Sequence, residues 1–164
     1  MQQTTTTPHS KNAKQLLNDI DQGLICLPRF QRDFVWSIEK SAALVDSVLK
    51  GFPIGALIFW RTSETLKDHR QLGRFKLPEP PVGQERNYVL DGQQRLTSLY
   101  AALRGVKIEL ADGRKRDFTQ LWVNLSAQAE DDDFCVSDVG DLDESRCIPL
   151  KDLFELSALS LAKD

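Results

Sequence analysis

Residues 88–95 of this chain read YVLDGQQR, and this stretch decides the fold prediction. Three apolar residues that favour a strand come first, and the residues after Arg95 have the apolar spacing of a helix. The stretch therefore predicts a strand that turns directly into a helix. The first amides of such a helix have no partner within it and lie beside the turn, where they can bind an anion.

The side chains of this turn suit a phosphate or another anion. Gly92 lets the backbone approach a ligand closely, and Arg95 offers a planar cation. Gln93 and Gln94 can form amide hydrogen bonds, and Asp91 can hold a divalent cation. The same pattern fits a tight turn in which Asp91 caps the helix and Arg95 is an ordinary exposed residue. The residues alone leave both interpretations open.

A second polar segment is PRFQRDFVW, residues 28–36. It interleaves two arginines and a glutamine with three aromatic side chains. Aromatic and cationic side chains in alternation can stack on a base and hold phosphates, and they make Gln31 and Arg32 candidates for a binding site. The aromatic residues are equally the expected anchors of a hydrophobic core.

The composition is that of one globular domain. Of the 164 residues, 41% are hydrophobic and 27% are charged, which is enough for a substantial core. The net charge of −3 argues against a strongly basic nucleic-acid-binding surface. Three cysteines without CxxC spacing fit a reducing compartment, so we expect a cytoplasmic protein. No apolar run is long enough to span a membrane, and the Thr-rich residues 1–9 are expected to be loose.

Hydrophobic periodicity and capping residues predict the order of the elements. We expect four helices: one capped by Ser10 or Asn12 and ended by Gly23, one from Ser37 to Gly51, one ending at Gly105 and one opening at Pro149. Strands are expected at residues 24–27, 54–60, 88–90, 106–110, 118–125, 134–137 and 146–148, with 54–60 buried. The polar excursion 61–86 is expected to be a functional loop or a flap. The mixture indicates an α+β or α/β domain.

Sequence patterns exclude several enzyme classes. The chain has no GxxxxGK[ST] sequence, so it is not a P-loop NTPase, and it has no GxGxxG. His9 and His69 are its two histidines, and neither has metal-ligand spacing, which excludes an HNH-type nuclease motif. No general base stands out, because Glu39, Glu64 and Glu85 are candidates by charge alone.

Three motifs occur in order along the chain: PRFQRDFVW at 28–36, FPIGALIFW at 52–60 and YVLDGQQRLTSLYAAL at 88–103. Together they resemble the N-terminal domain of the GmrSD-type modification-dependent restriction endonucleases, a bacterial family marked by DGQQR, over about residues 24–104. The resemblance implies one domain over residues 1–164 with a ParB/sulfiredoxin-like α+β fold, in which helices flank a mixed sheet.

The resemblance also implies a nucleotide site. By motif match, the site residues are Asp91, Gly92, Gln93, Gln94 and Arg95, with Gln31 and Arg32 as companions that we expect to lie close to them. The implied ligand is a nucleoside triphosphate with Mg²⁺, held in part by Asp91. The implied function is nucleotide binding, often with hydrolysis, that controls a nuclease in anti-phage defence. The alternatives are a ParB-like DNA-binding module without turnover and a protein-interaction module whose ancestral site has decayed.

Two departures from related families bear on activity. Sulfiredoxins place a cysteine before a histidine–arginine pair in this loop, whereas Gln93 and Gln94 precede Arg95 here, so sulfinic-acid reductase chemistry is not expected. Family proteins usually continue into a larger C-terminal region, often an HNH-type nuclease. We therefore expect an N-terminal piece of a longer protein that does not cleave DNA by itself and reaches DNA through the full-length protein. The apolar residues of the last helix also suggest a missing neighbour, either a further domain or a second copy in a homodimer.

Overall fold

A computed structural model describes residues 8, 10–28, 33–66, 68–69, 71–72, 75–76, 83–110, 112–128, 132–140 and 142–160. The helices in these ranges are α1 (Ala13–Asp21), α2 (Ile38–Leu49), α3 (Gln93–Arg104) and α4 (Leu150–Ser160), with the 3-10 turns η1 (Phe118–Gln120) and η2 (Glu144–Arg146). The strands are β1 (Ile25–Pro28), β2 (Ile58–Thr62), β3 (Asp68–His69), β4 (Gln71–Leu72), β5 (Phe75–Lys76), β6 (Arg86–Asp91), β7 (Lys107–Glu109), β8 (Lys115–Asp117), β9 (Trp122–Asn124), β10 (Cys135–Val136) and β11 (Cys147–Pro149). Helices and strands mix along the chain, which confirms the α+β prediction.

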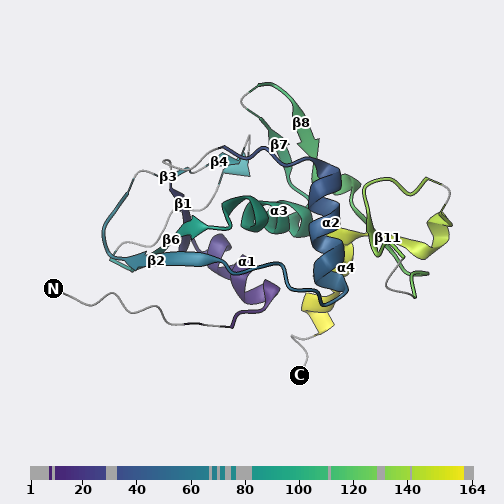
Figure 1. Cartoon of the computed structure of the whole chain (residues 1–164), viewed down its shortest axis with the longest axis horizontal. Coiled ribbons are helices and arrows are strands. Elements are labelled where there is room, and N and C mark those ends of the chain that lie inside the picture. Colours follow the sequence, from purple (N-terminus) through teal and green to yellow (C-terminus); the bar gives the residue numbers. More distant parts are fainter. Residues whose placement is uncertain are drawn as a thin grey trace.

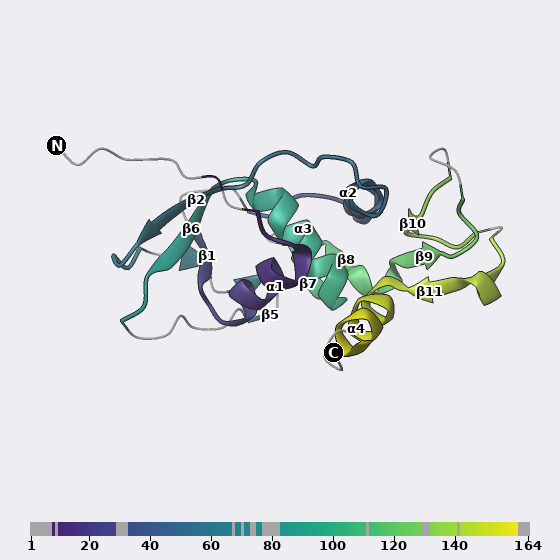
Figure 2. The same cartoon turned by 90° about the horizontal axis from the view of Figure 1, so that it is seen from below.

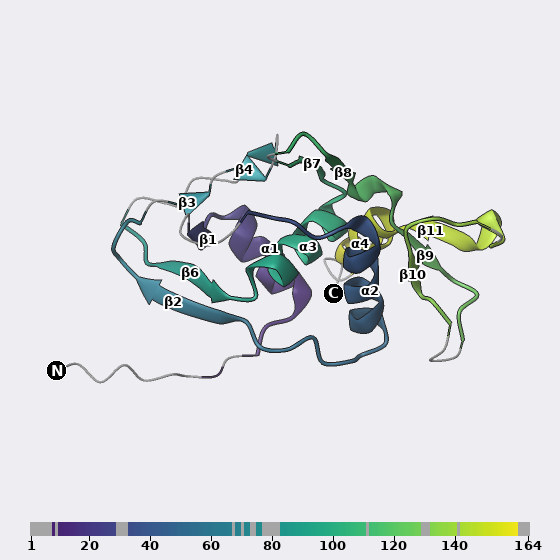
Figure 3. The same ribbon diagram turned by 45° about the horizontal axis from the view of Figure 1, so that its top comes forward.

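The main sheet is mixed and lies at one end of the molecule (Figures 1 and 3). Its strand order is β2-β6-β1-β3, with β1 parallel to β6 and both outer strands antiparallel to their neighbours. Strand β6 turns directly into α3, which runs through the centre, and a second sheet in the order β10-β9-β11 lies at the other end. The strand–turn–helix at residues 88–95 thus connects the main sheet to the central helix.

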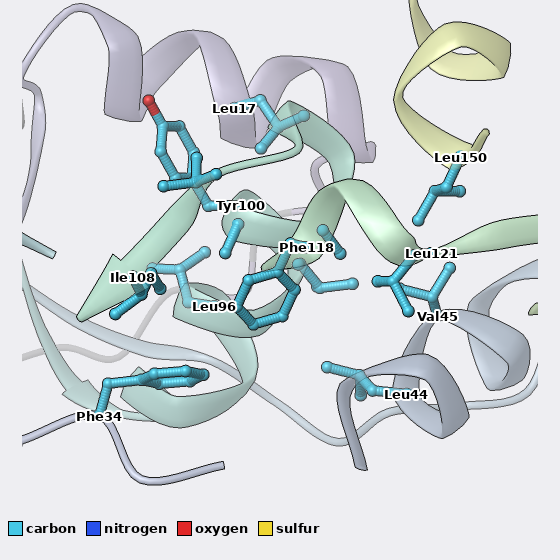
Figure 4. Packing of buried hydrophobic residues seen from close by; sticks show 14 of the residues in the cluster. Leu17, Phe34, Leu44, Val45, Leu96, Tyr100, Ile108, Phe118, Leu121 and Leu150 are labelled. Atoms are coloured by element: carbon cyan, nitrogen blue, oxygen red, sulfur yellow. The ribbon is translucent and has the colours of Figure 1, made fainter. Parts of the chain in front are cut away.

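Helix α3 is the centre of the hydrophobic core. Seen from below, it lies between α2 on one side and α1 and α4 on the other (Figure 2). Figure 4 shows the side chains of Leu96 and Tyr100 among those of Leu17, Phe118 and Leu150, each at most 2% exposed. Nine of the twelve residues of α3 are buried, and this packing sets the position of its first turn.

Local capping signals explain why the helices begin and end as predicted. Asn12 caps α1 in a reciprocal capping box with Gln15, and the Ser37 side chain accepts a hydrogen bond from the Lys40 amide at the start of α2. Gly105 ends α3 in a left-handed conformation. These three boundaries agree with the sequence analysis.

The prediction of a buried strand at residues 54–60 is wrong. Strand β2 begins only at Ile58, and residues 52–57 have no regular structure. Gly55 within them adopts a left-handed φ of 83°, which a regular strand does not contain. Strand β2 also lies at the edge of the sheet. Its outward side chains therefore stay open, and Ile58 and Trp60 are 49% and 39% exposed.

The predicted strand at residues 118–125 is also placed wrongly. The antiparallel partner of β7 is the charged segment Lys115–Asp117, whereas Phe118 begins a 3-10 turn whose N-cap is Asp117. Only Trp122–Asn124 form a strand, and this strand pairs with β10 and β11. The Phe118 side chain fills the core beside Phe34, with ring centroids 6.1 Å apart.

The apolar side chains in the first turns of helix α4 pack against the core of the domain. Leu150 is 1% exposed, and Leu153 and Phe154 pack against the core, so this half of the helix does not indicate a missing neighbour. The side chains of residues 156–161 lie outside the described residues. Exposed apolar side chains lie elsewhere, at the end of α2 and along 52–60. The predicted second copy or further domain stays a prediction.

In the part of the chain that the structure describes, no helix combines the length and apolar character that a membrane crossing requires.

Candidate functional site at the first turn of α3

The first turn of α3 presents backbone donors without a side-chain cap. Gly92 is the N-cap, in a left-handed conformation with φ 86°, and Leu96 donates the first intrahelical bond to its carbonyl at 2.9 Å. The amides of Gln93, Gln94 and Arg95 therefore have no partner within the helix. The N-cap is Gly92 and not Asp91, so the interpretation of Asp91 as a cap is wrong. Uncapped amides and the helix dipole favour a negative group at this end.

Arg95 lies in the same turn and is held by two acceptors. Its Nη1 donates to the Ile54 carbonyl at 2.7 Å, and its Nη2 donates to Asp91 Oδ2 at 3.0 Å. The Arg95 side chain is 21% exposed, whereas that of Asp91 is 64% exposed. The guanidinium is thus fixed in direction and still reaches the surface.

Two glycines make room for this guanidinium. A Cβ atom at Gly55 would lie 2.5 Å from Arg95 Nη1, and one at Gly92 would lie 3.2 Å from Nη2. The Gly92 position is also closed by Leu57, whose Cδ2 would lie 2.3 Å from an added Cβ. Residues 54–57 therefore pack directly against the DGQQR turn.

Gln94 joins the same turn to the segment that follows Arg32. Its Oε1 accepts from the Val35 amide at 3.0 Å, and its Nε2 donates to the Asp33 carbonyl at 3.0 Å. Gln94 is 8% exposed, so both bonds are sheltered from water. Gln31 and Arg32 lie outside the described residues, and their predicted closeness to the DGQQR turn stays a prediction.

Gln93 and Thr97 carry buried polar atoms without a hydrogen-bond partner among the described residues. Gln93 is 7% exposed and Thr97 is 2% exposed, and the atoms concerned are Gln93 Oε1 and Thr97 Oγ1. They lie one helical turn apart, on one side of α3. Buried polar atoms in proteins are usually hydrogen-bonded, so both atoms are available as acceptors on this side of α3.

Comparison with known proteins gives the family. Residues 13–160 match the family model described as GmrSD restriction endonuclease, N-terminal domain. The chain belongs to this family. The resemblance seen in three motifs is confirmed, and the match extends it to most of the chain. The GmrSD N-terminal domain is a restriction-system domain, whereas the ParB-like detail of its fold stays a prediction.

One curated relative is similar to this GmrSD N-terminal domain over most of the chain. It is the uncharacterized protein MJ0686 of Methanocaldococcus jannaschii, 30% identical over 130 residues, which cover 75% of this chain and 22% of that protein. The chain thus spans about a fifth of the length of this relative. No solved structure matches the chain.

The aromatic residues of the 28–36 motif serve the core where they are described. Phe34 is 8% exposed, and Trp36 packs against the core with Lys40 Nζ 4.3 Å from the centre of its ring. Arg116 Nε donates to the Trp36 carbonyl at 3.3 Å. For these two rings, the prediction that they anchor the core is confirmed, and the alternative that they stack on a base is not supported.

The candidate general bases are dispersed. Glu85 pairs with Arg61 at 2.6 Å, at the end of the β2–β6 pair opposite Asp91. Glu39 lies in the first turn of α2, where the Ser37 hydroxyl hydrogen bond and then a backbone bond lower its pKa. Among the described residues, no three His, Cys, Asp or Glu side chains gather into a metal-binding group.

The residues that hold the DGQQR turn lie outside the motif and were not predicted from the sequence. Gly55 and the carbonyl of Ile54 fix Arg95, and the backbone of Asp33 and Val35 fixes Gln94. The shared order of the three motifs was the one signal that these segments belong together.

Proposed function

We propose that the first turn of α3 binds the phosphates of a nucleoside triphosphate, and that this binding regulates the restriction activity of the protein that contains the domain. The observation that carries the proposal is the uncapped N-terminus of α3 beside the partly exposed guanidinium of Arg95. Amides at a helix N-terminus together with an arginine are a common phosphate-binding arrangement. The family, a restriction endonuclease domain, supports the regulatory part.

Each residue of the turn has a distinct part in the proposed binding. The amides of Gln93, Gln94 and Arg95 donate to phosphate oxygens. A guanidinium has five N–H donors, and the bonds to Ile54 and Asp91 use two of them, so Arg95 retains donors for an anion. Asp91 is the proposed ligand of Mg²⁺, which would neutralise phosphate charge at the mouth of the turn. Gln31 and Arg32 are proposed to close over the nucleotide.

Magnesium-dependent hydrolysis is the extension of this proposal. In phosphoryl transfer, the protein contributes chiefly positioning and charge stabilisation, and a helix N-terminus with an arginine supplies both. Water would attack the terminal phosphorus and the bond to the bridging oxygen would break, which gives a nucleoside diphosphate and inorganic phosphate. The nucleoside diphosphate would then lack the charge of the terminal phosphate at the turn. Under this proposal, the partners are the remaining parts of a cytoplasmic restriction endonuclease, which contact the DNA.

Calorimetric titration of the purified chain with ATP, GTP, CTP and UTP tests the proposal, each with Mg²⁺ and again with EDTA. We expect one nucleotide at least to bind with one site per chain and to bind more weakly in EDTA. Release of phosphate from the same mixtures measures hydrolysis. If none of the four nucleotides binds at millimolar concentration under either condition, the proposed function is wrong.

A further inference from the structure

We propose that Gly55, which lies outside the DGQQR motif, is a positioning residue for the anion site, because it directs the guanidinium of Arg95 toward the N-terminus of α3. This inference rests on the proposed function for the ligand, but its geometry is independent of any ligand. Gly55 is 40 residues before Arg95 in the sequence and belongs to the apolar segment that joins α2 to β2 (Figure 1).

Contact between Gly55 and Arg95 is closer than any side chain at position 55 would allow. An alanine Cβ at position 55 would lie 2.5 Å from Nη1, 3.5 Å from Cζ and 4.0 Å from Nη2 of Arg95. The carbonyl of Ile54, in the preceding residue, accepts the Nη1 bond at 2.7 Å. The segment thus positions the guanidinium in two ways. The carbonyl of residue 54 accepts a hydrogen bond from it, and the absence of a side chain at residue 55 leaves room for it.

Two separate requirements make position 55 a glycine. Its φ of +83° strains any other residue, and its open face is filled by the guanidinium. Gly51 has the first requirement without the second. It lies in the same segment with a φ of +75°, but nothing lies within 4 Å of an added Cβ. Alanine at position 51 therefore carries the backbone strain without the contact, and it is a matched control.

The atoms that an alanine at position 55 would meet are the end of a flexible side chain. The guanidinium can move away, so Gly55→Ala is expected to redirect Arg95 and not to unfold the domain. Once displaced, Arg95 loses its bond to Ile54 and no longer points along the first turn of α3. A charge-assisted phosphate contact is worth about tenfold or more in affinity, and this is the loss that we expect.

The experiment compares wild type, Gly51→Ala, Gly55→Ala, Arg95→Ala and the double variant Gly55→Ala/Arg95→Ala. Two quantities are measured: the dissociation constants for ATP, GTP, CTP and UTP with Mg²⁺, and the urea midpoint of unfolding. We expect Gly51→Ala to bind like wild type and Gly55→Ala to bind about tenfold or more weakly. In the Arg95→Ala background, Gly55→Ala should weaken binding no further, since its effect acts through Arg95.

The outcomes separate this inference from the proposed function. Equal affinity of Gly55→Ala and Gly51→Ala overturns the positioning role while nucleotide binding stands. If wild type binds none of the four nucleotides, the proposed function fails, and the urea midpoints of unfolding decide the contact between Gly55 and Arg95. Gly55→Ala should then lower the midpoint more than Gly51→Ala does. This additional decrease must disappear when Gly55→Ala is made in the Arg95→Ala variant. Should Gly55→Ala fail to fold, the double variant must fold for the inference to hold.

Discussion

At the scale of single residues, Gln94 holds two segments of the chain together. Its amide is the link between α3 and residues 33–35, which lie 59 to 61 positions earlier. We expect Gln94→Met, which keeps the size of the side chain, to lower the free energy of unfolding by about 1–3 kcal/mol, because a sheltered N–H and carbonyl lose their partners.

Urea denaturation measures this change. Gln128→Met is the matched control because Gln128 is exposed, and we expect it to change the stability by less than about 0.5 kcal/mol. If the two variants have the same stability, Gln94 does not hold the 33–35 segment.

The residues of the site could be predicted from the sequence more fully than their contacts. Gly92 and Arg95 were predictable because a glycine turn before a helix and a cation one turn later are local patterns. The partners of Arg95 and Gln94 were not, because they are backbone groups of Ile54, Asp33 and Val35. Every residue carries such groups, so composition and spacing give no signal for the ones that are used.

At the scale of the elements, Asp46 joins α2 to the second sheet. Its Oδ1 accepts from the amides of Phe134 and Cys135 at 2.7 and 3.2 Å, and its Oδ2 pairs with Lys50 Nζ at 2.7 Å. The side chains of Asp46 and Lys50 are only 13% and 10% exposed. A largely buried carboxylate that serves three donors is costly to remove.

We expect Asp46→Ala to lower the free energy of unfolding by about 3 kcal/mol, since two amides and the largely buried ammonium of Lys50 lose their acceptor. Thermal and urea unfolding measure the loss. Asp19→Ala is the control because Asp19 pairs with Lys11 near the surface, where an ion pair contributes at most about 1 kcal/mol. A loss below about 1 kcal/mol for Asp46→Ala would show that the second sheet does not depend on this contact.

Helix boundaries were predictable because caps act within a few residues, as at Asn12 and Ser37. The bounds and burial of the strands were less predictable, because the burial of a strand depends on its position in the sheet. The run 54–60 is as apolar as a central strand but lies at an edge, and β8, which is Lys-Arg-Asp, has no apolar pattern at all. Pairing across the sheet, and not local composition, decides both cases.

At the scale of the whole molecule, a buried thiol makes stability depend on pH. Burial, and then the charges of Asp46 and Asp133, raise the pKa of Cys135 to about 12. In the unfolded chain, a cysteine ionises near pH 8.5. Above that pH the folded state therefore binds more protons than the unfolded state, and stability is lost as the pH rises.

We expect the free energy of unfolding to fall between about pH 9 and pH 12, by up to about 1.4 kcal/mol per pH unit for this thiol. Urea titrations at a series of pH values measure the slope. Cys135→Ala should flatten it, whatever its effect on the absolute stability. The pKa of Tyr100 is also raised, by burial and by its bond to Asp21, so the clearest comparison lies near pH 9 to 10. An unchanged slope in Cys135→Ala would contradict the account.

The most direct test of the central claim is a two-dimensional ¹H–¹⁵N NMR titration of the ¹⁵N-labelled chain with a nucleoside triphosphate and Mg²⁺. The account predicts that the largest shift changes occur at the backbone amides of Gln93, Gln94 and Arg95, with smaller changes at Gly55, whose segment touches Arg95. Changes that spare these amides and gather elsewhere, for example on the β7–β8 hairpin, would contradict the claim that the first turn of α3 is the nucleotide site.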